Sequence, residues 1–117
     1  MIKTIVIAHK KPSLTDAEFN RHWKEVHGPL AAKLIPGVRR YVQNHLVSVP
    51  GYQYEGNGIV EMWYDSLESH QKSLEFLRSP SAQELAQDAG KFCIMKPGGI
   101  WLVEEHVIKD ELSKMKG

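Results

Sequence analysis

This chain of 117 residues has only one cysteine, no excess of charge of one sign and no long apolar run. Its single cysteine, Cys93, excludes an internal disulfide and a cysteine-based zinc site. Lys and Arg number 15 and Asp and Glu 14, so the formal charge is +1 with neutral histidines. This balance argues against a nucleic-acid or polybasic membrane partner, because both need a surplus of Lys and Arg on one face.

The length fits one domain, and we predict a single domain over residues 1–117 with a charged tail at 110–117. No apolar run approaches the ~18 residues of a membrane span. The N-terminal segment lacks the small-residue cleavage site of a signal peptide. We therefore expect a cytoplasmic protein with no membrane partner.

Apolar and β-branched patterns predict four strands, over residues 2–10, 38–48, 59–65 and 100–108. Thr15 and Glu18 form a capping-box pattern, which predicts a helix from Asp16 to about His27. We expect Gly28 and Pro29 to stop that helix and Pro29 to begin a short second one, over residues 29–34. Further helices are predicted over 67–77 and 81–89, and a turn at 97–99.

The order strand, helix, strand, strand, helix, strand is typical of the ferredoxin-like βαββαβ fold. This is an α+β fold with a four-stranded antiparallel sheet and helices on one face. In the first strand Ile5 and Ile7 point to one side, and Val6 and Ala8 to the other. Helices cover only one side, so the other would be a large apolar patch. We therefore expect a homodimer in which a second sheet covers it.

Four segments of the chain resemble the EthD (ether-degradation D) domain family. They are residues 19–30 (FNRHWKEVHGPL), 36–45 (PGVRRYVQNH), 61–68 (EMWYDSLE) and 104–106 (EEH). The resemblance covers residues 2–109 and implies a dimeric α+β barrel with a pocket between sheet and helices. It further implies cyclase, isomerase or dehydratase chemistry on aromatic, polyketide or lactone molecules, or an accessory role in ether degradation, without metal or organic cofactor.

His27 is the strongest catalytic candidate. The first helix presents Phe19, Trp23 and Val26 inward, and His27 lies four residues after Trp23, on that same face. At the predicted helix end its ring would project into open space and exchange protons near neutral pH. The alternative is a histidine that caps the helix and donates to a carbonyl.

Tyr41, Gln43 and His45 alternate along one face of the second strand. If this face points toward the helices, all three line the pocket, with Tyr41 or Gln43 polarising a substrate carbonyl and His45 as a second base. If it points away, they belong to the dimer interface. Periodicity predicts that the three side chains lie on the same face of the sheet, but it does not predict whether that face is the one toward the helices.

Glu61 and Trp63 share a face of the third strand, and His106 shares a phase with Glu104 in the fourth. Glu61 would orient a histidine, or pair with Arg39 or Arg40. Because neighbouring strand residues point to opposite faces, Glu104, Glu105 and His106 do not form a metal cluster, and we expect no metal site. The remaining pocket candidates are Trp23, His70, Phe92 and His106.

We therefore expect a cofactor-free enzyme that binds a small aromatic or hydrophobic substrate. His27 would move a proton beside a carbonyl, and Tyr41 would hydrogen-bond the oxygen that gains charge. His22 falls off the inward stripe and is expected in solvent, paired with Glu18. One rival is a binding or accessory protein that delivers a ligand to a partner oxidase. The other is a scaffold whose pocket is filled by its own tryptophans.

Overall fold

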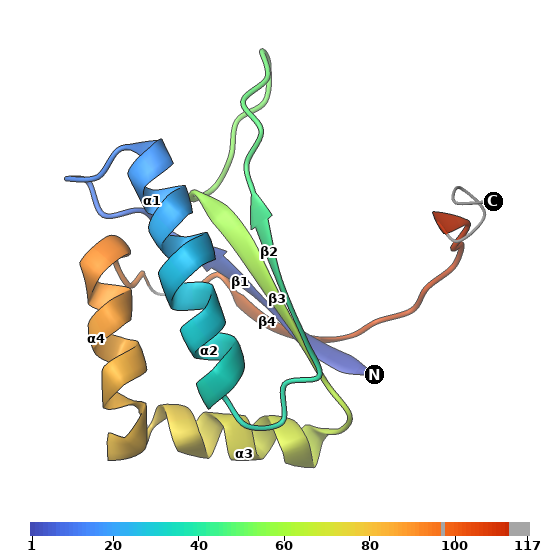
Figure 1. The fold of residues 1–117 in the computed structure, drawn as a ribbon. Helices are drawn as coiled ribbons and strands as arrows, with labels where there is room; N and C mark the ends of the chain where they lie inside the picture. Colours follow the sequence, from blue (N-terminus) through green and yellow to red (C-terminus); the bar gives the residue numbers. More distant parts are fainter. Residues whose placement is uncertain (97, 113–117) are drawn as a thin grey trace.

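The computed structural model describes residues 1–96 and 98–112 (Figure 1). Four strands, β1 (Ile2–Ala8), β2 (Arg40–His45), β3 (Gly58–Tyr64) and β4 (Ile100–Glu104), form one antiparallel sheet in the order β2-β3-β1-β4. The predicted ferredoxin-like fold is therefore confirmed. Residues 97 and 113–117, from the predicted turn and tail, lie outside the described residues.

The helices gather on one face of this sheet (Figure 1). A long helical rod comprises α1 (Asp16–His22), a π-helical turn η1 (Trp23–His27) and α2 (Gly28–Leu34). The second helical region comprises α3 (Leu67–Leu77), a 3-10 turn η2 (Pro80–Ala82) and α4 (Gln83–Phe92). Both side chains of the predicted capping box bond as expected, with Thr15 accepting from the Glu18 amide and Glu18 accepting from the Thr15 amide.

The prediction that Gly28 and Pro29 stop the first helix is wrong. The helix runs through them, because its backbone widens into a π-turn over Trp23–His27. The N–H of Gly28 donates to the carbonyl of Trp23, five residues earlier. A proline inside an α-helix lacks a donor and presses on the carbonyl one turn back. A widened turn relieves that pressure without ending the helix.

Strand register assigns the two faces of the sheet. Tyr41 pairs with Met62, and Gln43 with Val60, so these side chains share a face with Tyr64. Tyr64 bonds to Ser73 of α3, with 3.0 Å between their hydroxyl oxygens, which identifies this face as the one toward the helices. Two buried clusters lie between this face and the helices: Phe19, Trp23 and Phe92, and then Ala31, Ile35 and Leu85.

The opposite face carries no helix among the described residues. The sequence predicted a large apolar patch there, but this face also carries charged side chains. Lys3 crosses its centre, with Nζ 2.7 Å from Glu61 Oε2 and 2.9 Å from Glu105 Oε2. The indole of Trp63 donates to Glu105 at 3.0 Å, and the Arg40 guanidinium lies 4.7 Å from its ring centroid. A polar network of balanced charge therefore crosses this face, and apolar side chains such as Ile5 and Trp101 lie beside it.

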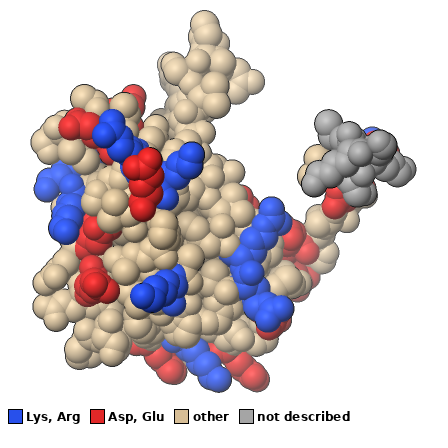
Figure 2. Space-filling model, viewed as in Figure 1, with Lys and Arg blue, Asp and Glu red and all other residues tan. Residues whose placement is uncertain are grey.

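Charged side chains of both signs are interspersed over the surface seen in Figure 2. None of the helices in the described part of the chain combines the length and apolarity needed to cross a bilayer. The surface pattern agrees with the near-zero net charge of the sequence.

Gly58 is where the sheet and the rod approach most closely, and Gly58→Ala tests that contact. A Cβ there would lie 2.5 and 2.7 Å from two atoms of the Trp23 ring. We expect the free energy of unfolding to fall by about 1–3 kcal/mol, because the core must shift. Gly90→Ala is the control: a Cβ at this helical position meets nothing within 4 Å. It should stabilise by about 0.5–1 kcal/mol. Equal effects of the two changes in urea unfolding would contradict this packing.

Candidate functional site

A buried carboxylate holds two imidazoles together between the helical rod and α4. Asp88 Oδ2 lies 2.9 Å from His27 Nδ1, and its two oxygens lie 3.0 and 3.1 Å from His22 Nε2. The Asp88 side chain is 7% exposed, that of His27 15% and that of His22 25%. We call these three residues the His22–Asp88–His27 cluster.

The π-turn explains why both histidines reach one carboxylate. Side chains five residues apart on a regular α-helix point about 140° away from each other, because each residue turns the chain by about 100°. A π-turn, which bonds residue i to i+5, has more residues per turn, so such side chains point in much closer directions than on an α-helix. The widened turn over Trp23–His27 therefore brings His22 and His27 to the same side. It also turns Val26 outward, to 47% exposure, against the expectation that it faces inward.

Aromatic rings enclose the two imidazoles. The Phe92 ring centroid lies 4.8 Å from that of His27 and 4.9 Å from that of His22. Phe92 is itself buried against Phe19, with 5.5 Å between the ring centroids. The cluster therefore lies at the edge of the first hydrophobic core, where water is largely excluded.

Burial lowers the pKa of His27 from its usual range, and the positive form of His22 would lower it further, whereas the hydrogen bond and charge of Asp88 partly restore it. His27 is thus neutral at pH 7. A carboxylate only accepts hydrogen bonds, so His27 donates through Nδ1–H and keeps a free lone pair on Nε2. This is the arrangement of a general base with an orienting carboxylate.

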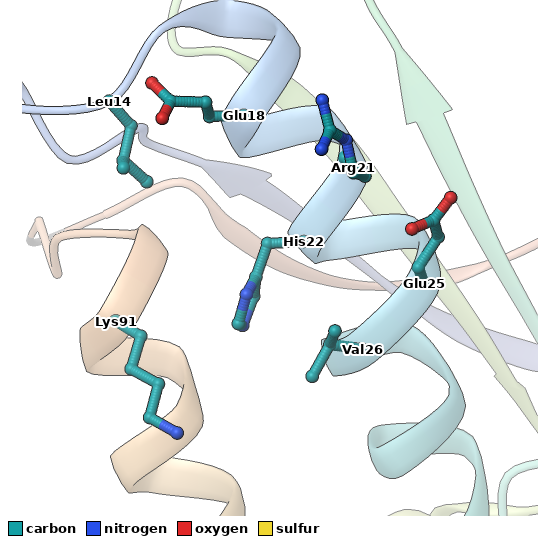
Figure 3. A pocket seen from close by; sticks show the side chains of 7 residues that line it. All are labelled: Leu14, Glu18, Arg21, His22, Glu25, Val26 and Lys91. Carbon is teal, nitrogen blue, oxygen red and sulfur yellow. The ribbon is translucent and has the colours of Figure 1, made fainter.

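A groove opens beside the cluster, between α1 and α4 (Figure 3). Its volume is about 290 Å³. His22 points from α1 toward α4 and forms part of its wall. The other lining residues are Leu14, Glu18, Arg21, Glu25, Val26 and Lys91. The imidazole that the sequence predicted to be solvated is thus the one that meets this groove.

The sequence-predicted pocket residues on β2 face the helices. Gln43 donates from Nε2 to the carbonyl of Trp23 at 2.7 Å, and His45 Nε2 lies 2.8 Å from Gln43 Oε1. The His45 ring stacks on the Trp23 indole, with 4.7 Å between centroids. Tyr41 packs in the second core cluster, and its hydroxyl accepts from Gln43 at 3.3 Å. Burial raises the pKa of Tyr41, and burial first and then the charge of Lys24 lower that of His45.

Several other predicted site residues lie elsewhere. Glu61 and Trp63 project from the helix-free face, so neither lines a pocket between sheet and helices, and Glu61 pairs with Lys3 rather than with a histidine or an arginine. His106 lies beyond β4 with a 70% exposed side chain, 2.7 Å from Glu104. His70, on α3, packs edge-on against Tyr64 of β3. Strand phase was correct for Glu61 and Trp63, but phase does not identify the covered side. The predicted strand over 100–108 ends at Glu104, so His106 lies outside it.

Asp88 is the member of this cluster that the sequence did not predict. Its signal was a carboxylate on the apolar stripe of a helix, between Leu85 and Phe92, all three of which are buried. A charged residue at such a position needs partners, because burying it alone is costly. Across residues 1–96 and 98–112, no group of three or more His, Cys, Asp or Glu side chains is arranged to hold a metal ion.

A family model described as the EthD domain matches residues 11–93. A search of curated proteins gave no match. The chain is similar in structure to an ethyl tert-butyl ether D (EthD) family protein from Bacillus halodurans, with 26% identity and a TM-score of 0.62, covering 91% of this chain and all of that one.

Two further solved structures share the fold. An EthD-like protein from Ralstonia eutropha has 16% identity and a TM-score of 0.67, covering 94% of this chain and 96% of that one. A protein from Bacteroides fragilis, described as dimeric, of unknown function and ferredoxin-like, has 15% identity and a TM-score of 0.55, with 87% and 91% covered. At these identities the likeness supports the fold alone.

Asp88→Asn tests the electrostatics of the cluster. Removing the negative charge removes the influence that raises the pKa of His27, so this pKa should fall further below the ordinary histidine range. An amide accepts through one oxygen only, so one imidazole loses its partner and stability should fall by about 1–3 kcal/mol. NMR titration of the His27 ring and urea unfolding measure both. Glu84→Gln, an exposed change on the same helix, is the control. An unchanged His27 titration in Asp88→Asn would contradict the contact.

Proposed function

We propose, because the chain belongs to the EthD domain family, that the His22–Asp88–His27 cluster moves a proton beside a carbonyl group of a small molecule. The substrate is an aromatic, polyketide or lactone compound, and the reaction is a cyclisation, isomerisation or dehydration. The observation that carries this proposal is one buried carboxylate shared by two imidazoles, one of which lines a groove.

The proposed base is His27. Its neutral ring offers Nε2 to a carbon-bound proton, while Asp88 holds Nδ1 and stabilises the imidazolium that forms. Returning that proton to another atom of the same substrate completes the reaction. No redox step is involved, so the side chains of the cluster suffice. A positioned base of this kind contributes about 10²–10⁴ in rate.

The groove narrows the substrate class. A volume of about 290 Å³ is at the lower end of the ~300–1,000 Å³ usual for ligand pockets. It suits a molecule with one ring better than a fused polyketide. His22 lines this groove and would contact such a molecule directly. His27 shares Asp88 with His22 but is not a lining residue, so the reacting carbon must pass His22 to reach Nε2 of His27. Arg21 and Lys91 on the rim are the proposed cationic donors to an oxygen that gains charge.

Tyr41 packs in the second buried cluster and does not line this groove, so it is a proposed donor only to a substrate that extends between the sheet and the helices. Burial raises the pKa of its phenol, so the hydroxyl is protonated at neutral pH. That hydroxyl accepts from Gln43 and keeps its own hydrogen to donate. Gln43 is less suited to polarise a substrate, because its amide hydrogens already serve the Trp23 carbonyl and Tyr41.

His27→Ala tests the proton transfer without knowledge of the final product. The protein is incubated in D₂O with a panel of single-ring aromatic ketones and lactones, and exchange of hydrogen beside the carbonyl is followed by proton NMR. We expect the catalysed exchange to fall by about 10²–10⁴, the usual contribution of a positioned base. His106→Ala, at a largely exposed histidine, should leave it unchanged.

Full exchange by a folded His27→Ala protein would contradict the assigned role. Panel members that bind without any exchange would instead favour the accessory or binding function.

We also propose that the helix-free face of the sheet joins two copies into a homodimer. On this face the two positive charges of Lys3 and Arg40 balance the two negative charges of Glu61 and Glu105, so little net charge would be desolvated on association. Trp101, the register partner of Ile5 on the same face, is 50% exposed. A contiguous apolar area of this kind is typical of an association surface. The Bacteroides fragilis protein of the same fold is described as dimeric, which supports this arrangement.

Trp101→Lys tests the dimer. A charge within the interface should shift the protein from dimer to monomer in sedimentation velocity at micromolar concentration, because an unpaired buried charge is costly. Leu102→Lys is the matched control, since Leu102 is the next residue of β4, 44% exposed, and faces the other side. A wild-type monomer, or dissociation by Leu102→Lys alone, would contradict the proposed interface.

A further inference from the structure

The carbonyl of Trp23, inside the π-turn, accepts hydrogen bonds from two directions. One donor is the N–H of Gly28, in the helix itself. The other is Nε2 of Gln43, which reaches it from β2 at 2.7 Å. In a regular α-helix this carbonyl would accept from His27 instead. The second bond therefore ties the sheet to the one turn whose width sets the spacing of His22 and His27.

Gly28 leaves the space that the Gln43 amide occupies. A Cβ at position 28 would overlap Nε2 of Gln43 and lie 3.0 Å from the Trp23 carbonyl. Gly28 is buried and its φ of −58° is one that any residue adopts. The glycine at this position is thus explained by the neighbouring side chain and not by its own backbone.

Gln43 is itself held in one orientation. Its Oε1 lies 2.8 Å from Nε2 of His45. Its Nε2 lies 3.3 Å from the Tyr41 hydroxyl in addition to its bond to the Trp23 carbonyl. The His45 ring is stacked on the Trp23 indole at an interplanar angle of 12°. If His45 Nε2–H donates to Oε1, the amide nitrogen must face the Trp23 carbonyl.

We propose that Gln43 is a positioning residue, whose amide locks the π-turn so that His22 and His27 both bond to Asp88. Without this bond the turn would relax toward α-helical spacing, and the two imidazoles would diverge. The consequence for catalysis rests on the proposed function, but the consequence for the geometry of the cluster does not.

Gln43→Met is the test, because methionine keeps the length and bulk of glutamine and removes the donor. We expect the His27 ring to leave Phe92 and Asp88, and its NMR titration midpoint to rise toward that of an exposed histidine, since burial is the larger influence on it. Asp88→Asn moves the same midpoint downward, so the two variants are distinguished by direction. Hydrogen exchange on the substrate panel should fall about tenfold or more, because the base is displaced.

Asn44→Met is the matched control. Asn44 is the next residue of β2, and its amide donates to the Ile59 carbonyl and to Glu61 on the other face. It should leave the His27 titration unchanged. A folded Gln43→Met protein with an unchanged His27 midpoint would overturn the proposal. Failure of His27→Ala to affect exchange would overturn the proposed function alone, since the titration result does not depend on it.

If Gln43→Met does not fold, NMR measurements on the wild-type protein test the same proposal. We expect slow hydrogen exchange at the Gln43 side-chain amide and a through-bond coupling between the Gly28 amide nitrogen and the Trp23 carbonyl carbon. Rapid exchange of that side-chain amide, or coupling of the Trp23 carbonyl to His27 in place of Gly28, would overturn the proposal.

Discussion

The widened turn at Trp23–His27 is the constraint on which the rest of the site depends. A chain that continued as an α-helix would present His22 and His27 about 140° apart, and no single carboxylate would reach both. Pro29 disfavours that continuation because its ring crowds the turn before it. The π-turn resolves the conflict inside the helix, and the two imidazoles come to one side as a result.

Burial then gives this geometry its chemical character. A carboxylate as enclosed as Asp88 needs charge-compensating or hydrogen-bonding partners, and the two histidines supply them. The Phe92 ring touches both imidazoles and excludes water from them. Desolvation keeps His27 neutral, while Asp88 stays available to stabilise it once it gains a proton. Packing and proton chemistry are therefore set by the same few contacts between the rod and α4.

Caps and hydrophobic periodicity predicted most helices and strands correctly, because each of these features depends on residues close together in the sequence. The capping box at Thr15 forms as expected, and α3 spans the predicted residues. The strand order follows from the sequence of elements, and the family match over residues 11–93 agrees with the resemblance seen in the motifs. What failed was counting at 3.6 residues per turn past Trp23. That count placed Val26 in the core, whereas the π-turn directs it outward. His22 precedes this turn, and it was expected in solvent because the sequence does not show that Asp88 of α4 lies against it.

Counting along one helix or strand could not predict contacts between residues that lie far apart in the sequence. Asp88 meets His27 across 61 residues of sequence, and only the packing of α4 on the rod brings them together. Strand phase likewise grouped Gln43 with Tyr41 but could not say that this side faces the helices. Neighbouring residues of β2 show how the face on which a side chain lies decides its contacts. Gln43 bonds to the helix that carries the site, while Asn44, one residue on, bonds to Glu61 in the network of the free face. One short strand thus connects the His22–Asp88–His27 cluster on one side of the sheet with the proposed association surface on the other.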